Sequence, residues 1–191
     1  IALGHEAIDG TFGRSHPVEI LRVQIEVLAL GGGIELEVVE CLGHSMAEIG
    51  FFERSTRTLV IADPLLPPFN PVLYLYEDPN VMRATFDKIE AFLRERDVAQ
   101  VLFAHDDPKG IEDTIDLIND CRRRVDKVEE SILTHIKANP GIGFAELRDK
   151  CCDDQDMVRE WRALVSIDAS LRNFEAKGLI KRQDEGWAHA T

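Results

Sequence analysis

The sequence predicts a mixed α/β (α+β) fold, and three observations support this prediction. Short runs in which apolar and polar residues alternate predict strands in the first part of the chain. Two Asp-Pro pairs, each followed by apolar residues at helical spacing, predict helices between and after those strands. The last third of the chain has helical patterns that end in a small hairpin. The 191 residues are enough for one large domain or two small ones.

The composition is that of a folded, water-soluble protein. Hydrophobic residues make up 45% of the chain and charged residues 30%. No apolar run approaches the ~20 residues of a membrane span and no signal-peptide pattern opens the sequence, so we expect a cytoplasmic protein without a membrane partner. The four cysteines show no C-x-x-C spacing, which argues against a zinc ribbon and favours reduced thiols.

The negative charge is concentrated in the first part of the chain. The whole chain has 22 Lys and Arg against 35 Asp and Glu. Residues 119–191 contain 13 basic and 14 acidic residues. The remaining 9 basic and 21 acidic residues give residues 1–118 a net charge of −12. An acidic surface repels nucleic acid at long range, so a nucleic-acid partner is not expected. This balance is compatible with a small-molecule substrate held by metal ions.

Five strands are expected in the first part of the chain. A Gly-rich turn at residues 31–33 lies between two alternating runs and predicts a hairpin, because no helix or phosphate-loop motif follows the glycines. The expected strands are Val23–Leu30, Ile34–Glu40, Met46–Glu53, Thr58–Ala62 and Gln100–Ala104.

Three of these strands end at a residue that can bind a metal. The strand that ends at Glu40 is followed by Gly43, which frees the backbone to turn, and then by His44. Two further apolar strands deliver Asp63 and His105. If these strands share a sheet, two imidazoles and one carboxylate at strand ends form a metal-ligand pattern.

Helices are expected after each Asp-Pro pair. Asp78 and Pro79 predict a helix start, and the apolar stripe that follows extends to about Arg96. Asp107 is predicted to cap a second helix, whose stripe either continues for more than 25 residues or breaks near Asp120. Between strand and first helix, four prolines at positions 64–71 predict a long loop.

Two sets of side chains outside these elements leave alternatives open. Tyr74 and Tyr76 in the Pro-rich loop either line a substrate pocket or cover the core, and we favour the core. In the tail, short and long helices are expected at Phe144–Cys151 and Met157–Lys177, with a hairpin after Gly178. The basic residues there either meet phosphates or form an ordinary solvated face; neighbouring acidic residues favour the solvated face. They are Arg159, Arg162, Arg172 and Lys177.

Three motifs, in this order, resemble the second half of the metallo-β-lactamase superfamily. They are Gly43-His44-Ser45, Ala62-Asp63 after an apolar strand, and Ala104-His105. The resemblance covers roughly residues 1–118 and implies half of an αββα sandwich there. The helices and hairpin of residues 119–191 are similar to the winged-helix tail that some members carry.

The resemblance also implies a chemistry. The position matching His44 serves one metal, that matching Asp63 bridges two metals, and that matching His105 serves the second. Zinc is the expected metal, with iron or manganese as alternatives. The metals of this family activate water for attack on an ester, thioester, amide or phosphodiester. No residue of this chain is assigned a catalytic role beyond metal binding.

The family's first-half signature, His-x-His-x-Asp-His, does not occur in the 191 residues. Three donors spread over two metals do not complete a catalytic site. The missing donors could lie in a longer parent protein, come from a second chain, or have been lost from a non-catalytic scaffold; the start at Ile1 rather than Met favours the first explanation. A half-sheet with an apolar face also needs a partner, so we expect association, for example as a homo-oligomer.

Two other functions are compatible with this sequence. The tail could make the chain a nucleic-acid-binding or regulatory winged-helix module, although the overall acidity argues against strong duplex binding. A catalytically inactive scaffold whose tail mediates dimer contacts is the other alternative, and it predicts that no metal binds.

Overall fold

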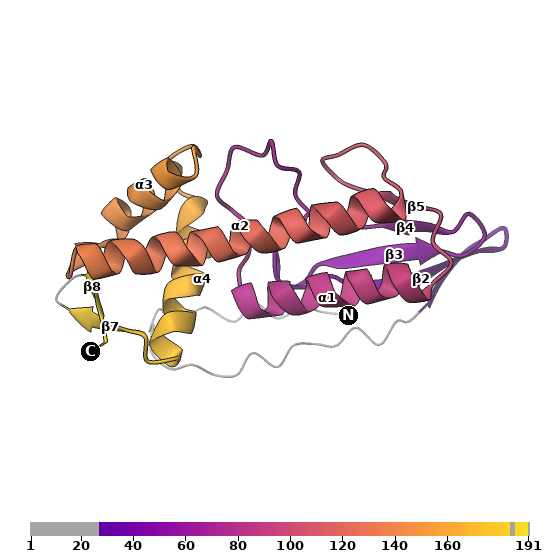
Figure 1. Ribbon diagram of the computed structural model, residues 1–191. Coiled ribbons are helices and arrows are strands. Elements are labelled where there is room, and N and C mark those ends of the chain that lie inside the picture. The colour runs from indigo at the N-terminus through magenta and orange to yellow at the C-terminus, as the bar shows by residue number, and fades with distance from the viewer. Residues whose placement is uncertain (1–26, 184–185, 191) are drawn as a thin grey trace, which may run out of the picture.

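The computed structural model describes residues 27–183 and 186–190 (Figure 1). In this part of the chain, two sheets and four helices confirm the predicted α/β class. The beginning of the strand expected at Val23–Leu30 lies outside the described residues. None of the described helices has an apolar stretch long enough to cross a bilayer.

A five-stranded sheet in the order β1-β2-β3-β4-β5 forms the first part of the molecule. Neighbouring strands are antiparallel except β4 and β5, which are parallel because helix α1 connects them. The Gly-rich turn joins β1 and β2 as a hairpin, as predicted. The strands are β1 (Val27–Gly31), β2 (Ile34–Glu40), β3 (Ile49–Glu53), β4 (Thr58–Val60) and β5 (Gln100–Leu102).

Helix α1 (Pro79–Glu95) begins where the sequence predicts it. The Asp78 carboxylate accepts hydrogen bonds from the backbone N–H groups of Asn80 and Val81, at 2.8 and 3.0 Å. Pro79 occupies the first helical position, where its missing N–H is no loss. Arg96 is the C-cap, so the predicted end is also confirmed.

Helix α2 (Ile111–Ala138) is one continuous helix without a break near Asp120. The prediction that Asp107 caps it is wrong, because the N-cap is Gly110. Lys109 exchanges two backbone hydrogen bonds with Val101 of β5, at 2.9 and 3.0 Å. This bridge pairs Lys109 with the edge strand β5 and delays the start of the helix.

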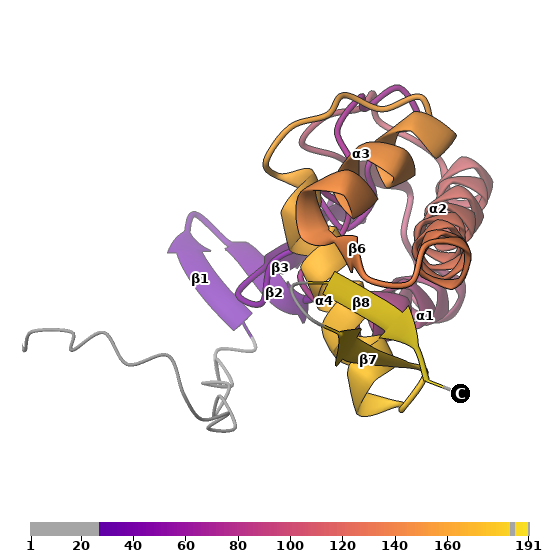
Figure 2. The same ribbon diagram turned by 90° about the vertical axis from the view of Figure 1, so that its left-hand side faces the viewer.

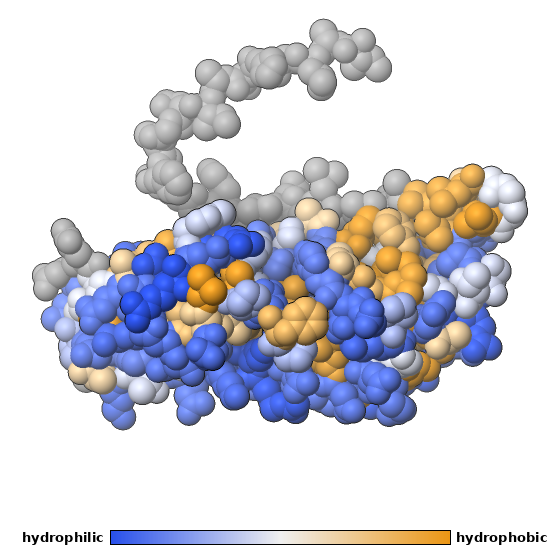
Figure 3. Space-filling view, turned by 90° about the horizontal axis from the view of Figure 1, so that it is seen from above, coloured by the Kyte–Doolittle hydropathy of each residue, from blue (hydrophilic) through white to orange (hydrophobic). Residues whose placement is uncertain are grey.

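The helices cover one face of the large sheet (Figures 1 and 2). Phe52 packs edge-on against Phe92 of α1, with ring centroids 5.3 Å apart. The other face carries a cross-strand row of apolar residues, none of which is fully buried. Figure 3 shows hydrophobic surface over the strands on its right-hand side. The buried row is Phe52, Leu59 and Val101; the row on the other face is Val38, Phe51, Val60 and Leu102.

The tail contains two short helices and a three-stranded antiparallel sheet in the order β6-β8-β7. The predicted hairpin is present, and the first short helix is three residues longer than expected. The prediction that the second helix begins at Met157 is wrong: the Val158 N–H bonds to the Pro71 carbonyl at 2.9 Å, which holds that segment extended. The elements are β6 (Ile142–Gly143), α3 (Phe144–Asp154), α4 (Ala163–Ala176), β7 (Ile180–Gln183) and β8 (Gly186–His189).

Helix α2 connects the two parts. It crosses the predicted domain boundary at residue 118 and packs on α1 at one end and on α3, α4 and β8 at the other (Figure 1). Buried side chains from both parts form one hydrophobic cluster. The division into residues 1–118 and 119–191 stays a prediction.

Candidate metal centre

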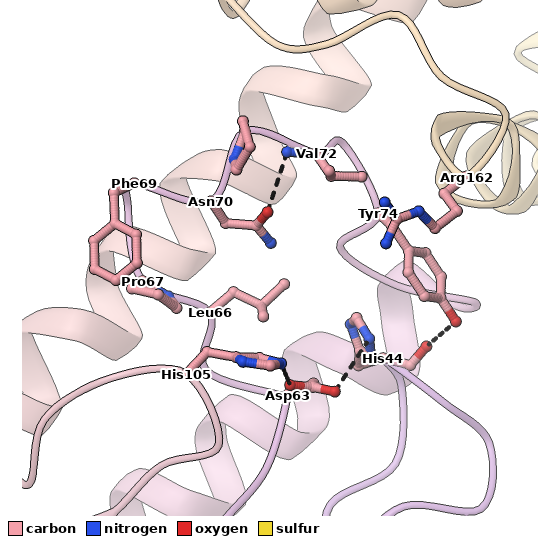
Figure 4. A pocket seen from close by; sticks show the side chains of 11 residues that line it. His44, Asp63, Leu66, Pro67, Phe69, Asn70, Val72, Tyr74, His105 and Arg162 are labelled. Carbon is pink, nitrogen blue, oxygen red and sulfur yellow. Dashed lines mark hydrogen bonds and ion pairs between the residues drawn. The ribbon is translucent and has the colours of Figure 1, made fainter.

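The structure brings together the three side chains that the sequence singles out. Nε2 of His105 lies 3.2 Å from Oδ1 of Asp63, and Nε2 of His44 lies 4.0 Å from Oδ2 of the same carboxylate (Figure 4). The strands that precede them are β2, β4 and β5 of one sheet. Their role as metal ligands stays a prediction, but their convergence is an observation.

Gly43 turns the chain after β2 and so places His44. Its backbone has a φ of +120°, which residues other than Gly rarely adopt. A Cβ on Gly43 would lie 2.5 Å from the Cα of Met82 in the first turn of α1. The Gly43 carbonyl accepts a hydrogen bond from the Glu77 N–H at 2.7 Å. The strand exit is therefore fixed against the start of α1.

The buried imidazole of His44 has a defined tautomer. Its Nδ1 lies 3.3 Å from the Leu75 carbonyl oxygen, which can only accept, so Nδ1 carries the proton. Burial lowers the pKa of His44 and favours the neutral ring, despite the opposing effect of Asp63. The lone pair is therefore on Nε2, the nitrogen that faces Asp63, as a metal ligand requires.

Asp63 is held by a second carboxylate, that of Glu48. The Asp63 backbone N–H donates to Oε1 of Glu48 at 2.7 Å. Burial raises the pKa of Glu48, and the nearby charge of Asp63 acts in the same direction. The role of Glu48 could not be predicted, because the strand expected at Met46–Glu53 begins only at Ile49 and leaves Glu48 in the irregular segment before β3.

His105 is the most accessible member of the set, with a side chain 62% exposed. It follows β5 directly. The neighbouring Asp106 has other partners: its carboxylate contacts Nζ of Lys109 at 3.1 Å and accepts a hydrogen bond from the Asp107 N–H at 2.8 Å. His105 is therefore positioned by its strand and by the 3.2 Å contact of its Nε2 with the Asp63 carboxylate.

A cavity of about 480 Å³ opens over the three side chains (Figure 4). Tyr74 lines it, contrary to our preference for a core position, and its ring lies 4.5 Å from that of His44, centroid to centroid. Tyr76 is fully buried, as predicted. Arg162 from the tail also lines the cavity. Its role could not be predicted, because nothing in the local sequence shows that the tail folds back onto this loop.

Comparison with solved structures identifies the architecture. A metallo-β-lactamase family protein from Thermus thermophilus superimposes with a TM-score of 0.67 over 86% of this chain, at 16% identity. A β-lactamase domain protein from Burkholderia ambifaria superimposes with a TM-score of 0.59 over 83% of the chain, at 18% identity. This chain has a metallo-β-lactamase fold. It covers 52% and 49% of those two proteins, about half of their length.

Other comparisons add little to this metallo-β-lactamase assignment. A sec-alkylsulfatase from Pseudomonas superimposes with a TM-score of 0.50 over 78% of the chain, at 16% identity, and the chain covers 25% of that protein. No protein-family profile and no curated protein matches the sequence. Three-dimensional similarity therefore confirms the predicted metallo-β-lactamase fold, whereas the winged-helix character of the tail stays a prediction.

The donors fit the metal ions that a metallo-β-lactamase fold implies. Among the described residues, no three His, Cys, Asp or Glu side chains converge on one point that could hold an ion. Asp63 instead presents one oxygen to each imidazole. Its Oδ1 is buried and forms no hydrogen bond within the described ranges, although Nε2 of His105 lies 3.2 Å away. A buried carboxylate oxygen that faces an imidazole nitrogen without a hydrogen bond is an atom that a cation between the two would satisfy.

Proposed function

We propose that this chain supplies one part of the metal site of a metal-dependent hydrolase. The observation that carries the proposal is the Asp63 carboxylate between two imidazole nitrogens, at 3.2 and 4.0 Å. A carboxylate with one oxygen toward each neighbour can serve two ions, whereas each imidazole serves one. Zinc is the expected metal, with iron or manganese as alternatives.

Each residue has a separate task in this proposal. His44 offers a lone pair fixed by its bond to Leu75, Asp63 is the shared ligand, and His105 is the ligand nearest to solvent. Glu48 positions Asp63 through its backbone N–H. A divalent ion bound there would supply Lewis acidity and activate water for hydrolysis of a small-molecule ester, thioester, amide or phosphodiester.

The remaining ligands have to come from outside the described residues. The chain covers about half of the metallo-β-lactamase structures that it matches, and its open sheet face carries apolar side chains. We infer that a further segment or a second chain packs on that face, and a homo-oligomer is one such arrangement. A cytoplasmic location remains part of the same proposal.

Residues 119–191 have the element order expected of a winged-helix tail, and we propose that likeness for them. A nucleic-acid-binding function is less well supported. Arg159 bonds to Asp153 at 2.5 and 2.7 Å, and Arg172 bonds to Asp168 at 2.9 Å. A duplex is bound by several cations spread along one face, and the carboxylates beside these two arginines reduce the positive charge of such a face. We therefore expect the tail to contribute to the cavity over the candidate metal centre, through Arg162, rather than to bind a nucleic acid.

Metal binding by the 191-residue chain tests the proposed function. We expect Zn²⁺ to bind in equilibrium dialysis, and Asp63→Asn to weaken binding by about tenfold or more, since it removes the shared charge. His135→Ala is the matched control, because His135 is a tail residue that contacts Asp154. Equal zinc binding by Asp63→Asn and the unchanged chain would contradict the proposal.

A further inference from the structure

The cavity beside the candidate metal centre has one apolar wall. The Pro-rich loop between β4 and α1 supplies Leu66, Pro67, Phe69 and Val72 to its lining (Figure 4). Phe69 is 71% exposed, which is unusual for a large aromatic side chain that has no catalytic chemistry of its own. An exposed apolar rim next to a polar floor is the arrangement of a ligand site rather than of a core.

Side chains of α2 and α4 hold this loop in place through hydrogen bonds to its backbone. The Arg124 guanidinium on α2 donates hydrogen bonds to the carbonyl oxygens of Leu66 and Pro67. Ser166 on α4 accepts bonds from the Leu75 and Tyr76 N–H groups, at 2.9 and 3.1 Å. The apolar wall is therefore anchored by the part-buried contacts of Arg124, and the end of the loop by the buried contacts of Ser166.

The tail supplies the opposite rim. Arg162 lies just before α4 and reaches the cavity near Tyr74 (Figure 4). The backbone bridge between Val158 and Val72 ties the segment that carries Arg162 to the loop that forms the wall. Because this bridge and the Ser166 contacts join the two segments, the distance between rim and wall is set by the fold.

Arg162 is also the only Lys or Arg among the described residues that line the cavity. Glu160 contacts its Nε at 2.5 Å and its Nη2 at 3.0 Å. That carboxylate does not use Nη1, and it orients the guanidinium rather than removing all its donors. A single oriented cation in a chain with a net charge of −13 points to recognition of an anionic group.

We propose that the ligands of this site are anionic amphiphiles. An apolar chain packs on the wall formed by Leu66, Pro67 and Phe69, and an oxyanion binds to Arg162. The bond to be cleaved then lies over Asp63, between the two. This inference rests on the proposed function and specifies its substrate class: molecules that combine an alkyl or acyl chain with a carboxylate, phosphate or sulfate.

Binding of simple probes to the 191-residue chain, measured by calorimetry, tests the proposal. The probes are octanoate, octyl phosphate and octyl sulfate, with neutral octanol and short acetate for comparison. We expect at least one eight-carbon anion to bind more tightly than both octanol and acetate. The tightest of the three anions identifies the oxyanion. Absence of any preference for the eight-carbon anions would overturn the proposal.

Two variants and a neighbouring control locate the binding. Arg162→Gln is expected to weaken binding of the preferred anion by about 10- to 100-fold and to leave the affinity for octanol unchanged. Phe69→Ser is expected to weaken binding of every eight-carbon probe and to leave the affinity for acetate unchanged. Arg159→Gln is the control, because Arg159 pairs with Asp153 and does not line the cavity. Equal losses in Arg162→Gln and Arg159→Gln would contradict the assignment.

Zinc binding separates this inference from the proposed function. If zinc binds through Asp63 but no anion depends on Arg162, the substrate class is wrong and the hydrolase proposal is unaffected. If anions depend on Arg162 but zinc does not depend on Asp63, the cavity is a binding site and the hydrolase proposal fails.

Discussion

The two faces of the large sheet differ in what covers them, although their side chains are similar. Phe51 and Phe52 are neighbours in β3, and Leu59 and Val60 are neighbours in β4. Because successive residues of a strand point to opposite faces, Phe52 and Leu59 lie on one face and Phe51 and Val60 on the other. Phe52 and Leu59 are 5% and 0% exposed beneath the helices, whereas Val60 is 40% exposed and Phe51 is half-buried. Alternation in these strands is therefore between two apolar faces, not between an apolar and a polar one.

The two faces show which side of the sheet the described chain covers and which side it leaves open. A strand that is apolar on both faces is typical of a sheet covered on both sides. Within the part of the chain that the structure describes, helices cover only one side (Figure 2). The covered face holds the sheet together, and the open face is the surface on which we expect a further layer.

The largest effect expected from this comparison is on adjacent phenylalanines. Phe52→Ala should lower the free energy of unfolding by about 3–5 kcal/mol, because it leaves a cavity under α1. Phe51→Ala on the open face should cost about 1 kcal/mol, since solvent can fill the space. Urea unfolding of the two variants measures both values. Equal losses would show that the two faces are equally covered.

The turn that positions His44 packs against α1, one of the helices on the covered face. Gly43→Ala should cost about 3 kcal/mol, because Ala at φ +120° is strained and its Cβ would meet the Met82 backbone. Gly110→Ala is the control, because no atom lies within 4 Å of a Cβ at that position. Thermal or urea unfolding distinguishes the two, and zinc binding should weaken only in the Gly43 variant.

The open face should govern association. We expect the 191-residue chain to elute from size-exclusion columns as an oligomer. Val60→Lys should weaken self-association by about tenfold, corresponding to loss of roughly 1.5 kcal/mol of apolar burial. Lys137→Glu, on the exposed side of α2, is the control. A compact monomer that Val60→Lys does not change would show that the open face needs no partner.

The smallest effect concerns a polar contact on the tail, far from either face. A hydrogen bond of 2.6 Å from Ser131, together with the contact to His135, lowers the pKa of Asp154. Because the folded pKa is below the unfolded value, the contact stabilises the fold at neutral pH and is lost as the pH falls below about 4.

Asp154→Asn should therefore cost less than about 1 kcal/mol at pH 7, because the carboxylate is partly exposed to solvent. The difference between the variant and the unchanged chain should shrink when unfolding is measured at pH 3. A difference that grows as the pH falls would contradict the assignment.

Most of the local structure and the identity of the candidate ligands follow from short-range patterns in the sequence. Alternation and the Asp78-Pro79 cap are short-range signals, so the strands and helix α1 could be placed within a few residues. His44, Asp63 and His105 could be recognised because each follows an apolar strand. Asp107 was assigned wrongly, because the pairing of Lys109 with β5 is a long-range contact that delays the helix.

Which side chains meet, in contrast, depends on how distant segments of the chain pack together. Glu48, Tyr74 and Arg162 line or support the site from irregular segments, although the sequence patterns place Glu48 in a strand and Arg162 in a helix. Arg162 reaches the cavity because Val158 pairs with Val72, two residues far apart along the chain. The helices on one face of the sheet likewise cannot be inferred from strands that are apolar on both sides. Local patterns fix secondary structure, whereas the choice of partner depends on contacts between distant segments.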